Sequence, residues 1–100
     1  MIARLWHGIT RTEKAQEYLA FLRERAVPDY RGTPGNLSVS LMQRDEGAIT
    51  HFLVLTHWES MQAIAAFAGP DTARAKYYPE DEGFLLGFES HVVHYHVDGA

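Results

Sequence analysis

The chain has 100 residues, no cysteine and a formal net charge of −4 at pH 7. This length predicts a single domain over residues 1–100. The acidic charge argues against nucleic acid as a partner, and the absence of cysteine excludes disulfides, thiolate catalysis and cysteine-ligated metals. The longest apolar stretches are far shorter than the roughly 20 residues of a membrane-spanning helix, so no membrane association is expected. The first residues lack the pattern of a secretory signal, and a cytoplasmic location is therefore expected.

The first predicted elements are a strand, a helix and a loop. Residues 1–9 carry bulky side chains at alternating positions, which predicts a strand. Thr10 and Glu13 match a capping box, in which each side chain satisfies a free amide at a helix start. An apolar stripe with steps of three and four residues continues this helix, and Pro28 is expected to end it. The Gly- and Pro-rich residues 29–36 then predict a loop.

The rest of the chain is predicted to hold three further strands and a short helix. The pattern predicts strands over residues 37–42 and 50–58, joined by a turn around Gly47. A helix is predicted over residues 61–68, and Gly69 and Pro70 end it. Helical turns around residues 73–77 and 80–82 and a strand over residues 90–97 complete the chain. This order predicts a ferredoxin-like α+β fold, an antiparallel βαββαβ sheet with its helices on one face.

The predicted strands carry apolar residues at both odd and even positions, which point to opposite faces of the sheet. This pattern predicts that neither face is exposed to water. In the first strand, Ile2 and Trp6 alternate with Leu5 and Ile9. Helices that cover one face would leave the apolar residues of the other face in water, and a large exposed apolar face usually marks an interface. We therefore predict a homodimer in which the open face packs against the same face of a second copy.

Histidine and aromatic residues are the candidates for chemistry. They are Trp6, His7, His51, His57, Trp58, Tyr77, Tyr78, His94, Tyr95 and His96. Adjacent residues of a strand point to opposite faces, so only one member of each pair faces a given cavity. Taken one at a time, the aromatic residues are most simply part of the core, and the histidines are most simply hydrogen-bonded within the sheet. The functional alternative is that one histidine acts as a base near neutral pH. His94 and His96 share a strand face, but no carboxylate of matching parity completes a three-ligand set, so no metal site is predicted.

Several motifs of common enzyme classes are missing from the sequence. There is no Gly-rich phosphate loop, no GxSxG elbow and no HExxH pair. Catalysis would therefore depend on His, Tyr and Trp in an apolar pocket. Such a pocket suits an aromatic substrate and is poorly suited to phosphoryl transfer.

Four segments resemble the antibiotic-biosynthesis monooxygenase family. They are ARLWHG at residues 3–8, LTHWESMQAIAAFAG at 55–69, KYYPEDEGFLL at 76–86 and HVVHYHV at 91–97. The resemblance implies a dimeric α/β barrel of two ferredoxin-like sheets. It also implies the addition of one oxygen atom from O₂ to a phenol without a cofactor or, in a related branch, haem degradation. That branch uses a polar residue, a Trp and an iron-binding His, and the matching positions hold His7, Trp58 and Tyr77, so a Tyr replaces the iron ligand.

The residues and the resemblance together predict one pocket per subunit between the sheet and the helices. Its predicted lining is His7, Trp58, Tyr77, Tyr78 and His94, with no cofactor and no metal. His7 is expected to act as the base, Trp58 to stack on the substrate, and Tyr77 to donate a hydrogen bond to a developing oxyanion. The predicted function is cofactor-independent oxygenation of a small aromatic or quinol-like compound. Two alternatives stay open, namely non-catalytic binding or sensing of a small apolar ligand, and haem binding.

Overall fold

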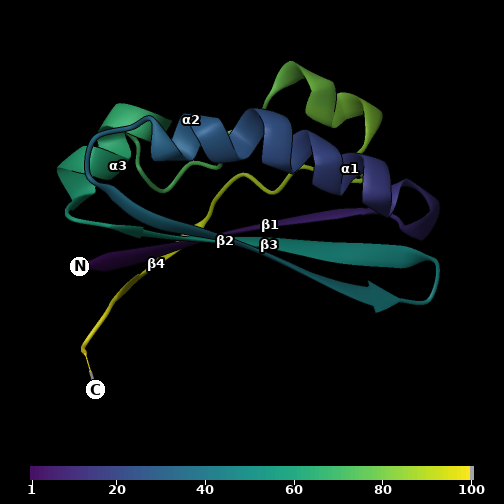
Figure 1. The fold of residues 1–100 in the computed structure, drawn as a ribbon, viewed down its shortest axis with the longest axis horizontal. Helices are drawn as coiled ribbons and strands as arrows, with labels where there is room; N and C mark the ends of the chain where they lie inside the picture. The colour runs from purple at the N-terminus through teal and green to yellow at the C-terminus, as the bar shows by residue number, and fades with distance from the viewer. Residues whose placement is uncertain (100) are drawn as a thin grey trace.

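The computed structural model describes residues 1–99 and forms a four-stranded antiparallel sheet with its helices on one face (Figure 1). The strands are β1 (Ile2–Arg11), β2 (Asn36–Glu46), β3 (Ile49–Trp58) and β4 (Val93–His96). The helical segments are η1 (Thr12–Lys14), α1 (Ala15–Phe21), η2 (Leu22–Ala26), α2 (Val27–Arg31), α3 (Met61–Ala68) and η3 (Pro79–Gly83). The spatial order β2-β3-β1-β4 confirms the predicted ferredoxin-like βαββαβ fold, while the dimeric barrel stays a prediction.

The pairing of β1 with β3 fixes which side chains face the helices. The two strands pair along their full length, from Ile2 opposite Trp58 to Arg11 opposite Ile49. Because successive side chains of a strand alternate between the two faces, even-numbered residues of both strands point toward the helices. The burial of these strands alternates accordingly, since β3 reads half-buried at every odd position and buried at every even one. Odd-numbered residues of β1 and β3 therefore lie on the uncovered face of the sheet, together with the even-numbered residues Met42 and Arg44 of β2 that pair with Leu53 and His51.

Aromatic side chains fill the space between the sheet and the helices. Trp58 lies at the end of β3 and packs against Phe67 of α3, with 5.7 Å between ring centroids. Phe67 stacks on Tyr30 of α2 at 4.3 Å, and Tyr18 of α1 meets Phe52 edge to face at 5.1 Å. Each such side chain contributes about 1.5–3 kcal/mol of stability when it is fully removed from water.

Pro28 does not end the first helix, contrary to the prediction from the sequence. The helical segments run without a gap from Thr12 to Arg31. Just before the proline, Leu22–Ala26 forms a wide π-turn in which the N–H of Val27 donates to the carbonyl of Leu22. A proline cannot donate to the carbonyl four residues earlier and its ring crowds that carbonyl. The wider turn gives the ring room and lets the helix continue.

Other boundaries also differ from the prediction. The Thr10–Glu13 capping box is wrong, because β1 continues to Arg11 and the Thr10 hydroxyl donates to the Arg11 carbonyl. The helical turns expected around residues 73–77 are wrong as well, because residues 71–74 form a single turn and residues 73–75 then exchange backbone hydrogen bonds with residues 90–92. The turn at residues 80–82 is confirmed within η3. Within residues 1–99 no helix is both long and apolar enough to cross a membrane.

Candidate functional site

The predicted helix-side pocket is filled by the protein's own side chains. Trp58 has no exposed surface, and its indole N–H donates to the Thr56 hydroxyl at 2.8 Å. Trp6 also points toward the helices and is buried. Its ring covers Gly8 so closely that an added Cβ there would lie 2.4 Å from the indole. Trp58 is therefore part of the core, and no surface of it is free to stack on a substrate.

His7 lies on the opposite face of the sheet from Trp58. His7 is an odd-numbered residue of β1 and points to the uncovered face, whereas Trp58 is an even-numbered residue of β3 and points to the helices. The prediction that both residues line one pocket is therefore wrong. At this part of β1, the side chain that reaches the helix side is Trp6.

Tyr77 and Tyr78 hold the segment between α3 and η3 in place. The Tyr77 hydroxyl donates to the Glu89 carbonyl at 2.6 Å, and its ring meets the edge of Trp6. The Tyr78 hydroxyl donates to the Asp29 carboxylate, which also accepts from Lys76. Burial raises the pKa of both tyrosines, and for Tyr78 the hydrogen bond to Asp29 adds to the effect. Both hydroxyls stay protonated and are engaged within the fold.

His94 joins a buried cation instead of a cavity. It faces Arg4 across the β1–β4 pair, with 3.2 Å between His94 Nε2 and an Arg4 guanidinium nitrogen. The same guanidinium donates to the carbonyls of Thr72 and Arg74. Burial, followed by the positive charge of Arg4, lowers the pKa of His94. A neutral His94 can accept a hydrogen bond from Arg4, so the two residues fasten β4 and the 72–74 segment to β1.

On the uncovered face, His7 is part of a chain of four hydrogen-bonded side chains. Nδ1 of His7 contacts the Glu89 carboxylate. Nε2 of His7 lies 2.9 Å from Nδ1 of His51 on β3, and Nε2 of His51 lies 3.1 Å from the Glu46 carboxylate at the end of β2. Hydrogen bonds from His51 and then Arg44 lower the pKa of Glu46, so this carboxylate is ionised at neutral pH.

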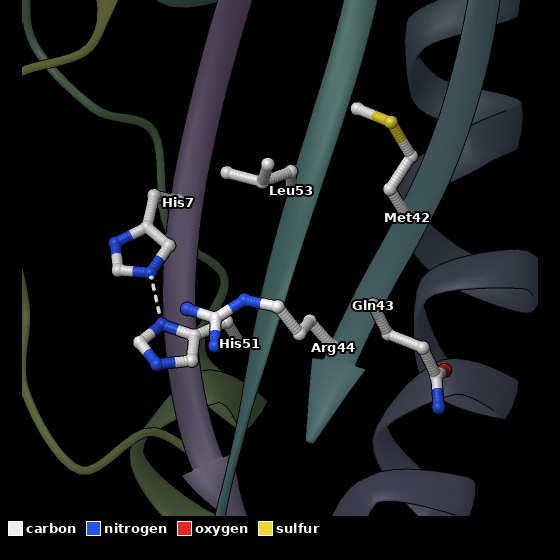
Figure 2. A pocket seen from close by; sticks show the side chains of 6 residues that line it. All are labelled: His7, Met42, Gln43, Arg44, His51 and Leu53. Carbon is white, nitrogen blue, oxygen red and sulfur yellow. Dashed lines mark hydrogen bonds between the residues drawn. The ribbon is translucent and has the colours of Figure 1, made fainter. Parts of the chain in front are cut away.

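A hollow of about 300 Å³ opens beside this histidine pair (Figure 2). Its lining residues are His7, Met42, Gln43, Arg44, His51 and Leu53. Met42 and Leu53 supply apolar surface, and the side chain of Arg44 extends from β2 across β3 toward His51. The volume is at the lower end for small-molecule sites, which suits a ligand of one or two rings. Of the five predicted site residues, only His7 lines this hollow.

Of the residues hydrogen-bonded in a chain with His7, the sequence indicates only His51. His51 has the same parity as His7, so the two would share a face once the strands were paired, yet its expected role was that of an ordinary sheet histidine. Glu46 lies at the hairpin end, where the register was not known. Glu89 lies 82 positions from His7 in a segment without a periodic pattern, and no sequence signal connects the two.

The geometry defines a ferredoxin-like domain with helices on one face and a histidine pair beside a small hollow on the other. The profile of the antibiotic biosynthesis monooxygenase family matches residues 7–75, which is more than half of the chain, and the chain belongs to this family. No curated protein matches the sequence. Among solved structures, the chain is similar to the crystal structure of an MhuD mutant with two manganese protoporphyrin IX bound per active site. The identity is 22% and the TM-score 0.61, over 97% of this chain and 94% of that chain, a likeness that shows the shared fold.

The positions expected for haem chemistry do not fit a porphyrin. Trp58 is fully buried, and the hydroxyl of Tyr77, which stands where an iron-binding His was expected, is engaged by the Glu89 carbonyl. Within residues 1–99, no three His, Cys, Asp or Glu side chains are arranged to hold a metal ion. Neither side chain is therefore free to contact a porphyrin or to ligate its iron in this structure.

Proposed function

We propose that the protein is a cofactor-independent oxygenase of a small phenolic or quinol-like compound, and that this substrate binds in the hollow beside His7 and His51. The observation that carries the proposal is the hydrogen-bonded histidine pair, flanked by carboxylates, on the wall of a partly apolar hollow. Family membership supports the reaction class. An enzyme of this kind needs a base, a shielded pocket and a shape that fits the ring, and the hollow offers the first and the third.

His7 is the proposed base. Its Nδ1 donates to Glu89, so Nε2 is the nitrogen that takes up and releases a proton. A carboxylate behind an imidazole fixes its tautomer and stabilises the imidazolium that forms when the other nitrogen takes a proton. In the free protein this Nε2 faces His51, and a phenolic hydroxyl would take the place of His51 when the substrate binds. The phenol then becomes a phenolate, which is electron-rich enough to react with O₂.

A second copy of the chain would supply the shielding. The sheet face that bears the hollow has no helix over it (Figure 1). Leu5, Leu53 and Leu55 are only half-buried there, and Val93 and Tyr95 of β4 are exposed. Covering this face with the same face of a partner would remove apolar surface from water and close the hollow. The proposed active unit is therefore a homodimer.

Oxygen consumption tests the proposed function directly. Oxygen uptake is measured with a panel of anthrones and quinols, for the wild-type protein and for His7→Gln. The variant should lose about a hundredfold or more of the rate, the usual contribution of a positioned base. His57→Gln is the matched control, because His57 lies on the same strand face outside the hollow and should retain wild-type turnover. Equal rates for His7→Gln and the wild type would refute the base. Thermal stabilisation by these compounds without oxygen uptake would instead indicate a binding or sensing domain.

Light scattering tests the homodimer. The wild type should elute at twice the chain mass of 11.3 kDa. Val93→Asp places a charge on the exposed apolar face, where a single chain tolerates it and a face-to-face dimer does not, so this variant should elute as a monomer. A wild-type protein with the mass of one chain at micromolar concentration would refute this part of the proposal.

A further inference from the structure

We infer that His7 and His51 work as one proton store, which holds a single extra proton between the two rings in the resting protein and makes His51 the second proton-holding group of the site. The proton count rests on the hydrogen-bond geometry alone. The use of this proton in turnover rests on the proposed function.

The hydrogen-bond geometry argues for three ring protons on the pair. Carboxylates only accept, so the nitrogens that face Glu89 and Glu46 must each carry a proton. The two remaining nitrogens, Nε2 of His7 and Nδ1 of His51, face each other at 2.9 Å, a hydrogen-bond distance that needs one proton between them. Three protons on two rings make one imidazolium and one neutral imidazole. If the two rings held only two protons, the two facing nitrogens would both carry lone pairs and would repel each other. If the rings held four protons, both facing nitrogens would carry an N–H group, and these groups would repel each other.

The surrounding charges favour this shared cation. Two carboxylates face the pair, Glu89 from the segment before β4 and Glu46 from the end of β2. Arg44 of β2 also lines the hollow, and its guanidinium lies 3.4 Å from the Glu46 carboxylate. In the resting protein the two carboxylates and the one imidazolium together have a net charge of −1; the charge of Arg44 is not included in this sum. A bound phenol that takes the place of His51 beside Nε2 of His7 would end the central contact. A second proton, taken from that phenol, would then give two separated imidazoliums, each beside its own carboxylate, and the phenolate would carry the negative charge.

A store of this kind suits the proton movements of phenol oxygenation. A phenol with a hydrogen on the reacting ring carbon loses its O–H proton to the pair, and that carbon of the phenolate forms a bond to O₂. The resulting peroxide anion takes a proton back from the pair. The pair then removes the C–H proton while the O–O bond breaks, and the departing hydroxide takes that proton as water. The phenol is oxidised to a quinone, one oxygen atom of O₂ is retained, and the pair receives and returns two protons.

Nuclear magnetic resonance of the ¹⁵N-histidine-labelled full chain tests the proton count without any substrate. At pH 7 we expect protonated Nδ1 in His7, protonated Nε2 in His51, and intermediate ¹⁵N shifts for the two nitrogens that face each other. A scalar coupling across the hydrogen bond should join the two facing nitrogens. His57, whose neighbour is Ser38, is the internal control and should show no coupling to another imidazole. The absence of both the intermediate shifts and this coupling would overturn the inference.

Two variants separate the store from the proposed reaction. Glu46→Gln removes the negative charge beside His51, so the signature of the shared proton between the two facing nitrogens should weaken at pH 7, whereas the His57 signals should not move. His51→Gln should lower kcat about a hundredfold or more and remove one limb of the pH–rate profile, while KM changes little. A shared proton without oxygen uptake by the wild type would refute the proposed function and leave the store standing. Oxygen uptake with an unchanged pH profile in His51→Gln would refute the role of the store in turnover.

Discussion

Replacement of Gly8 by Ala tests whether Trp6 fills the helix side of the sheet. A Cβ at residue 8 would lie 2.4 Å and 3.0 Å from two atoms of the Trp6 ring and 3.0 Å from a Leu85 methyl group. Trp6 is only 4% exposed, so its ring can move only by disturbing the core. Overpacking of this kind costs about 1–3 kcal/mol, and the reduced entropy of the unfolded chain offsets about 0.4–1 kcal/mol of it. The free energy of unfolding should therefore fall by about 1–2 kcal/mol.

Urea unfolding, followed by tryptophan fluorescence at one fixed protein concentration, measures this change. Gly83→Ala is the matched control, because nothing lies within 4 Å of a Cβ at residue 83 and its backbone is not in the left-handed region. The control should equal the wild type or be more stable by up to about 1 kcal/mol. A Gly8→Ala variant as stable as Gly83→Ala would show that the indole does not occupy this space.

Three further predictions concern other features of the fold and site. Asp81→Ala should lower the free energy of unfolding by about 1–3 kcal/mol, because the buried Tyr18 hydroxyl loses its acceptor; unchanged urea midpoints would contradict this. Although burial opposes the effect, hydrogen bonds from Tyr78 and Lys76 lower the pKa of Asp29. The wild type should thus be more stable than Asp29→Asn by the full amount at any pH above the pKa of an unfolded Asp, about 3.9. This difference should disappear as the pH falls through the lower pKa that Asp29 has in the folded protein. Urea midpoints of both proteins at several pH values measure it. Titration with hemin should give no Soret band of a ligated haem, and stoichiometric binding would contradict the poor fit of the helix side.

The sequence predicts the fold well because each element has a clear period. The apolar alternation of β3 and the three- and four-residue steps of α1 are local signals, and their order leaves few sheet topologies. The boundaries that failed depend on tertiary contacts. Residues 73–75 form no helix because residues 90–92 supply hydrogen bonds to their backbone, and no local pattern indicates such a partner.

The location of the site could not be predicted because hydropathy does not show which face the helices cover. On β1 and β3 the buried face includes polar residues, Arg4 and Thr50 among them, whereas Leu5 and Leu53 lie on the uncovered face. The two faces thus differ little in hydrophobicity, and the parity of His7 stayed ambiguous. The fold resolves it, because β1 can bury only one of its two faces against the helices.

Tyr77 links the helix side of the sheet to the segment that meets His7. The prediction places it in contact with the substrate, whereas its ring packs on the helix side against Trp6 and its hydroxyl donates to the backbone carbonyl of Glu89. The carboxylate of that same residue meets His7 on the other face. Tyr77 therefore fixes the segment that orients the proposed base, and the helix-side core and the uncovered face meet at one residue. A change in helix-side packing at Trp6 or Tyr77 would alter the position of Glu89 and, through it, the tautomer of His7.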